Sequence, residues 1–124
     1  MGKLKDLRDQ LISDLAVIGV PVIDDWWLQA EPPCVLITPP LGGPYVEAGE
    51  LFASFVLNVD AVVLVRRTPS DDGREQLENI LEDVLRNTVD WSLKGVDPPS
   101  TATRPDSTVE FFGTVVHLGK TLNL

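Results

Sequence analysis

Few side chains in this 124-residue sequence have the chemistry of catalysis. Cys34 and His117 are its only cysteine and its only histidine. A thiol and an imidazole can form a nucleophile and base pair, but these two residues lie far apart in the chain. Cys34 begins an apolar run, where cysteine behaves as a small buried hydrophobe. His117 lies in a strand-like segment that favours a half-buried structural role, so we expect no enzyme activity and no catalytic residue.

Paired acidic residues occur twice, and neither pair has the spacing of a metal site. Asp24-Asp25 and Asp71-Asp72 each supply two adjacent carboxylates, whereas a calcium loop needs several oxygen ligands at fixed intervals. Asp71-Asp72 is better explained by a following helix, whose N-terminus favours negative charge. Gly42-Gly43 lacks the lysine and the helix of a phosphate-binding loop. We therefore expect neither a metal nor a cofactor.

The charge distribution argues against conventional nucleic-acid binding. The formal net charge is −9, and no lysine or arginine occurs between Arg8 and Arg66. Binding to phosphate requires such cations. The longest apolar run, from Ala61 to Val65, is far shorter than the roughly 20 residues that span a bilayer, and the N-terminal segment lacks the features of a secretory signal. We expect one globular domain over residues 1–124 and no membrane segment.

Two segments have the periodicity of amphipathic helices. Apolar residues recur at spacings of three and four from Leu4 to Ile18, and Gly19 is a typical helix stop. The second helix is expected to begin at Asp72, which with Glu75 resembles a capping box. Its apolar positions run from Leu77 to Leu85.

Strand patterns surround these helices. They cover residues 20–23, 34–38, 52–67, 91–96 and 108–118, with Gly- and Pro-rich loops expected at 39–49 and 97–107. The segment 52–67 is about twice the usual strand length, so it either bends at a bulge or projects as a hairpin arm. These elements predict an α+β fold: a mostly antiparallel sheet with one long strand or hairpin arm, packed against two amphipathic helices.

Candidate interface residues lie in the loops and at strand ends. Adjacent residues on an extended chain point in opposite directions, so one tryptophan of a Trp-Trp pair can be buried while the other is exposed. Arginines in an acidic chain can provide specific docking contacts. The candidates are Trp26, Trp27, Leu41, Tyr45, Arg66, Arg67 and Arg104.

A family resemblance extends over nearly the whole chain. It rests on the helix with Leu7-Arg8-Asp9-Gln10-Leu11, then Gly19-Val20-Pro21-Val22, Pro33-Cys34-Val35-Leu36-Ile37 with the Pro-rich loop, the long Phe55-to-Val65 strand, the Leu77-to-Leu85 helix, Trp91-Ser92-Leu93 and the closing strand. This pattern resembles the tail terminator, or tail completion, proteins of long-tailed bacteriophages, especially those that infect actinobacteria.

The resemblance implies a structural virion protein that assembles in the host cytoplasm. It implies a ring, usually a hexamer, that caps the head-proximal end of the tail tube, stops tube polymerisation and joins the head. The implied partners are other copies of the chain, the major tail tube protein and a head-tail connector or stopper protein. DNA would pass through the lumen without specific binding, since acidic walls repel phosphate.

Three other functions are compatible with the sequence. The chain could be another phage neck or minor tail protein, because such proteins share much of the pattern. It could be an acidic DNA mimic that inhibits a nucleic-acid-binding protein, in which case binding would depend strongly on salt. A small enzyme that uses Cys34 or His117 would lose its activity when either residue is replaced by alanine.

Overall fold

The structure is a computed structural model, and it describes residues 2–24, 31–40, 42–66, 72–103 and 110–124. Two α-helices and seven strands confirm the predicted α+β class. In chain order the elements are α1 (Lys3–Leu15), a 3₁₀ turn η1 (Ala16–Ile18), β1 (Val22–Asp24), β2 (Cys34–Thr38), β3 (Val46–Ala48), β4 (Ser54–Arg66), α2 (Asp72–Arg86), β5 (Ser92–Val96), β6 (Ser100–Thr103) and β7 (Glu110–Asn123).

The strands form one sheet around a central pair. The order is β1-β2-β4-β7-β5, with β3 also paired to β4 and β6 also paired to β7. The β1–β2 pair is parallel and the other pairs are antiparallel, as the prediction of a mostly antiparallel sheet requires. β4 and β7 pair from Ser54 with Asn123 to Arg66 with Phe111 without a shift in register.

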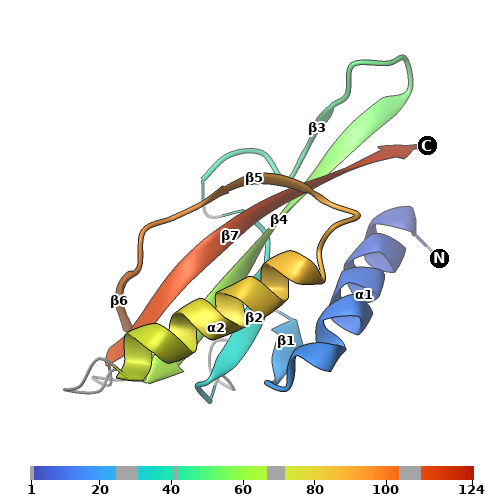
Figure 1. The fold of residues 1–124 in the computed structure, drawn as a ribbon. Helices are drawn as coiled ribbons and strands as arrows, with labels where there is room; N and C mark the ends of the chain where they lie inside the picture. Colours follow the sequence, from blue (N-terminus) through green and yellow to red (C-terminus); the bar gives the residue numbers. More distant parts are fainter. Residues whose placement is uncertain (1, 25–30, 41, 67–71, 104–109) are drawn as a thin grey trace.

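The long central strand forms an arm rather than a bulged strand. At its N-terminal end, β4 continues beyond α2, flanked by β3 and by the end of β7 (Figure 1). The N-terminus of α1 lies against Leu122 and Asn123 of β7. We call residues 46–57 together with residues 120–124 the arm. The sequence had left open a bulge or an arm, and the unbroken β4–β7 pairing decides for the arm.

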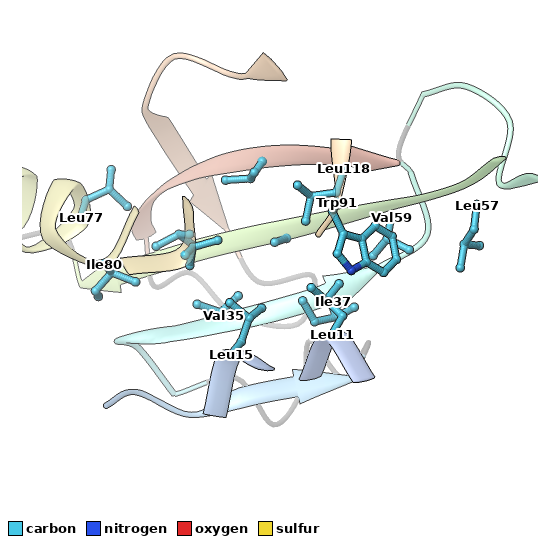
Figure 2. Close-up of a cluster of buried hydrophobic side chains, with 14 of the residues drawn as sticks. Leu11, Leu15, Val35, Ile37, Leu57, Val59, Leu77, Ile80, Trp91 and Leu118 are labelled. Atoms are coloured by element: carbon cyan, nitrogen blue, oxygen red, sulfur yellow. The ribbon is translucent and has the colours of Figure 1, made fainter. Parts of the chain in front are cut away.

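Both helices cover the same face of the sheet. Their apolar stripes pack on alternate residues of the strands and enclose the main core (Figure 2). This core includes Leu11 and Leu15 of α1, Leu77 and Ile80 of α2, Val35 and Ile37 of β2, Leu57 and Val59 of β4, Trp91 and Leu118. A smaller cluster lies on the opposite face and contains Cys34, Leu36, Val62, Leu64 and Phe111. Since β2 carries apolar side chains on both faces, every residue of it is buried.

Two segments expected to be loops each contain a strand. β3 lies within 39–49 and β6 lies within 97–107. Both strands are short, and the Ser-Thr-Ala-Thr sequence of β6 has no alternation of apolar and polar residues. They form because β4 and β7 extend further than their other neighbours and leave backbone groups to be paired. β7 also continues to Asn123, beyond the predicted end at residue 118.

The helix boundaries follow the sequence closely. Gly19 adopts a left-handed conformation with φ of 81°, which glycine tolerates without steric cost, and it ends the first helical segment as predicted. α2 begins at Asp72, so Asp72 is already helical. The capping contact expected of its side chain lies outside what the structure describes.

Close packing at Gly113 gives a test of the central strand pair. A Cβ at this position would lie 2.8 Å from the carbonyl oxygen of Val63 and from Cδ2 of Leu64. We expect Gly113→Ala to lower the free energy of unfolding by about 1–3 kcal/mol through overpacking. Urea denaturation would measure the loss.

Gly42 supplies the matched control, because a Cβ there would meet no atom within 4 Å. Gly42→Ala should change the stability by less than about 0.5 kcal/mol. Equal stability of the two variants would show that β4 and β7 do not approach each other as described.

Candidate functional site

A polar cluster lies on the sheet face opposite the helices. Asp60 of β4 is paired in register with His117 of β7. The Nδ1 atom of His117 lies 2.7 Å from Oδ1 of Asp60, and its Nε2 atom lies 2.8 Å from Oδ1 of Asp97. Asp60 is only 2% exposed, whereas Asp97 lies at the surface just after β5. The imidazole therefore links a buried carboxylate to an exposed one.

This geometry favours the protonated form of His117. A carboxylate accepts hydrogen bonds but does not donate them, so both ring nitrogens must carry a proton to bond both neighbours. Partial burial by itself lowers the pKa of His117, but the hydrogen bonds and negative charges of Asp97 and Asp60 outweigh it and raise the pKa above its ordinary value of 6.5. The residue acts here as a cationic bridge.

A second polar group adjoins the bridge. Lys94, at the irregular position between Leu93 and Gly95 of β5, contacts Oε1 of Glu47 at 2.9 Å. The side-chain amide of Asn58 donates to the same oxygen at 3.2 Å. The hydrogen bond from Lys94, followed by the one from Asn58, lowers the pKa of Glu47. The two groups border one open pocket of about 290 Å³.

The cluster lacks the arrangement of a nucleophilic active site. Both nitrogens of His117 are engaged by carboxylates. Cys34 is fully buried and pairs with Leu64. Leu64 lies four residues along β4 from Asp60, a distance of about 13 Å at ~3.3 Å per residue. The thiol and imidazole pair considered from the sequence is therefore not formed.

The bridge instead secures the segment that follows β5. The backbone N–H of Asp97 donates to the carbonyl of Val115 at 2.9 Å, and the hydroxyl of Thr114 donates to the carbonyl of Asp97. With the His117 contact, these bonds hold both the main chain and the side chain of Asp97 against β7. The sequence contained a signal for this cluster, because a lone acid such as Asp60 within an apolar strand needs a partner.

The two candidate interface residues that the structure describes, Tyr45 and Arg66, do not form a common site. Trp26, Trp27, Leu41, Arg67 and Arg104 lie outside the described residues. Tyr45 is partly exposed beside β3, and its carbonyl accepts the N–H of Asn58 at 2.8 Å. Arg66 is exposed at the far end of β4, where its Nε donates weakly to the carbonyl of Pro32 at 3.4 Å. Tyr45 and Arg66 thus lie toward opposite ends of the long strand.

The most exposed apolar surface lies at the end of the arm. Leu51 is 75% exposed, Phe52 is fully exposed and Leu124 is 67% exposed. We call these three residues the arm tip. The turn is held by hydrogen bonds, since the N–H of Leu51 donates to Oγ of Ser54 at 3.0 Å and the N–H of Gly49 donates to its carbonyl at 2.9 Å. Phe52 was predicted to begin a strand, and the sequence pattern did not indicate this surface.

Comparison with known proteins found no match that indicates a function. No protein-family model matches the sequence, and no curated protein matches it. Within the described residues, no group of three or more His, Cys, Asp or Glu side chains could hold a metal ion. No helix in the same part of the chain has the length and apolar character needed to cross a bilayer.

The bridge should make stability depend on pH. Because the folded-state pKa of His117 is raised, its contribution is fully present below about 6.5, the pKa of an unperturbed histidine, and is lost as the pH rises through the folded-state pKa. We expect His117→Gln to be less stable than the wild type by about 1–2 kcal/mol at pH 6. Urea denaturation between pH 6 and pH 9 should show this gap narrowing as the pH rises.

The Asp97→Asn variant measures how much the exposed half of the bridge contributes to stability, because it leaves the buried contact of His117 with Asp60 in place. Because the Asp97 side chain is 54% exposed, solvent screens its charge and we expect a smaller loss than for His117→Gln. A gap between the wild type and His117→Gln that stays constant with pH would contradict the cationic bridge.

Proposed function

We propose that this chain is a structural subunit of a ring that caps the head-proximal end of a phage tail tube, as tail terminator proteins do. The observation that carries the proposal is the arm, whose apolar tip is exposed to solvent and is not buried by the described residues of the chain. In this role the ring stops polymerisation of the tube protein and supplies a surface for the connector or stopper of the head.

The arm tip supports a function based on contacts. Full burial of a leucine or phenylalanine side chain contributes about 1.5–3 kcal/mol, which an isolated subunit forgoes at Leu51 and Phe52. Grouped, exposed apolar side chains are typical of protein interaction sites. Here they lie on a hydrogen-bonded turn at the end of a long sheet, so the surface is presented in a defined position.

The charge of the chain suits a ring around DNA. The formal net charge of the chain is −9, and no lysine or arginine occurs between Arg8 and Arg66. A lumen lined by carboxylates repels phosphate and lets a duplex move without being bound. A ring also limits its own growth, because rotation closes the set of contacts.

Assembly tests the proposal directly. Light scattering and electron microscopy should find a ring several times the 13.6 kDa mass of the chain, either alone or on tubes of the major tail tube protein of the same phage. Persistent monomer that never caps a tube would overturn the proposal. Salt-sensitive binding to a basic, nucleic-acid-binding protein would instead favour the acidic DNA mimic.

Replacement of the arm tip should separate assembly from folding. In the Leu51→Ser, Phe52→Ser double variant, we expect association to weaken at least tenfold, because about 1.4 kcal/mol of lost apolar burial corresponds to that factor. Sedimentation across a concentration series would measure the association. Thermal unfolding should be unchanged, since both side chains are exposed in the subunit.

Val89 gives the matched control for this variant. It is 80% exposed and lies in the turn between α2 and β5, outside the arm. Val89→Ser should assemble like the wild type. If the double variant also assembles like the wild type, the arm tip has no part in the ring.

A further inference from the structure

The arm has an unpaired strand edge on each side. Within the described part of the chain, β3 pairs with β4 alone. On the other side, β5 reaches along β7 only to Gly119, so residues 120–123 of β7 are paired with β4 alone. Both edges flank the same end of β4 (Figure 1). The N-terminus of α1 lies beside the end of the β7 edge, where Lys3 contacts Asn123. Unpaired edges of this kind readily accept another strand.

The hydrogen bonds of β3 identify which backbone groups point outward. The carbonyl of Tyr45 accepts from Asn58, and the N–H of Gly49 donates to Ser54. Backbone groups alternate in direction along an antiparallel strand. The backbone N–H and C=O groups of Val46 and Ala48, which lie between these bonded positions, therefore point away from β4.

The same alternation can be followed across to β7. Since Ser54 and Asn58 bond toward β3, Phe55 and Leu57 bond toward β7, where their register partners are Leu122 and Lys120. The intervening residues of β7, Thr121 and Asn123, therefore point outward. The bond from the N–H of Asp97 to the carbonyl of Val115 agrees, because it shows an odd-numbered residue of β7 facing that edge. The carbonyl of Asn123 already accepts Nζ of Lys3 at 2.7 Å.

The two edges match in direction and in length. β3 and β7 are both antiparallel to β4, so they run the same way. The β3 edge offers the outward backbone groups of Val46 and Ala48. The β7 edge offers those of Thr121 and the N–H of Asn123, because the carbonyl of Asn123 is bonded to Lys3. Copies whose arms point in the same direction can therefore place β3 of one beside β7 of the next. Because this contact joins two different surfaces, repeating it around an axis gives a ring when the rotation closes.

We propose that neighbouring copies of this chain join by parallel pairing of β3 in one arm with residues 120–123 of β7 in the next. This inference rests on the proposed ring function and names its interface. The pairing also sets adjacent arm tips side by side, so that Leu51 and Phe52 are covered by the neighbouring arm. The tip is needed, because stable interfaces bury about 800 Å² on each partner and two short strand edges supply only part of that area.

Proline variants test the edge pairing. Proline removes an N–H, and at Ala48 or Thr121 that N–H points away from β4. It makes no bond to the other described residues, so the subunit should still fold. We expect Ala48→Pro and Thr121→Pro each to weaken association about tenfold, the factor for loss of one backbone bond of ~1.4 kcal/mol. Sedimentation would measure this, and circular dichroism would verify the fold.

Thr101→Pro is the matched control. Ser100 pairs with Gly113, an odd-numbered residue of β7, so the N–H of the next residue, Thr101, also points outward. Thr101 is exposed and lies on an edge strand outside the arm. The Thr101→Pro variant should therefore assemble like the wild type. Equal effects of all three prolines, or no effect of the two arm variants, would overturn the edge pairing.

A cross-link gives a second measurement. Ala48 and Lys120 lie on the helix-bearing face, as shown by their register partners Phe55 and Leu57. Within one chain they are separated by β4, which puts their strands about 9.6 Å apart, too far for a disulfide. Mild oxidation of the Ala48→Cys, Lys120→Cys variant should therefore link different chains into a ladder on a non-reducing gel.

The cross-link outcomes distinguish the two proposals. A ladder with this pair, and none with the Ala48→Cys, Thr101→Cys control, supports the β3–β7 junction. A ring that forms without cross-links overturns the junction and leaves the ring function standing. If the wild-type chain forms no ring either alone or on tail tubes, the proposed function fails and the inference fails with it.

Discussion

The pairing of β4 with β7 is the interaction on which the rest of the structure depends. Each strand contributes side chains to both faces of the sheet. Because side chains alternate along a strand, one fixed register sets the main core, the smaller apolar cluster and the contact of Asp60 with His117 at once. A slip of one residue would turn the apolar side chains of the core toward the opposite face. The same ladder continues past α2 and becomes the arm.

Periodicity in the sequence was sufficient to predict the helices and the longer strands. The leucines of α1 and α2, the run Cys34–Thr38 and the alternation in β4 reflect burial by nearby layers, so each pattern can be recognised within its own segment. β3 and β6 could not be recognised in this way. Their residues lack a strong preference, and the strands form because β4 and β7 present unpaired backbone groups at the right distance.

The candidate site was less predictable than the fold because its contacts are distant in sequence. His117 was identified from the sequence as the lone imidazole, but only the β4–β7 register brings it beside Asp60. Asp97, which contacts the imidazole of His117, lies in the segment 97–107 that was predicted to be a loop. The arm tip was missed because the sequence pattern placed Phe52 at the start of the predicted strand 52–67. Their exposure follows from the turn that Ser54 holds, which is a property of the folded hairpin.

The order of the central strands along the chain has a kinetic consequence. β4 lies near the middle of the sequence and its partner β7 is the last described element. Ser54 therefore pairs with Asn123, a residue far from it in the sequence. Contacts between distant residues slow folding, since a long loop must close before they form. During synthesis the apolar face of β4 is completed well before β7 leaves the ribosome, a period in which unpaired strands tend to aggregate. The excess of acidic residues then has a further benefit, because mutual repulsion keeps nascent chains apart until the last strand arrives.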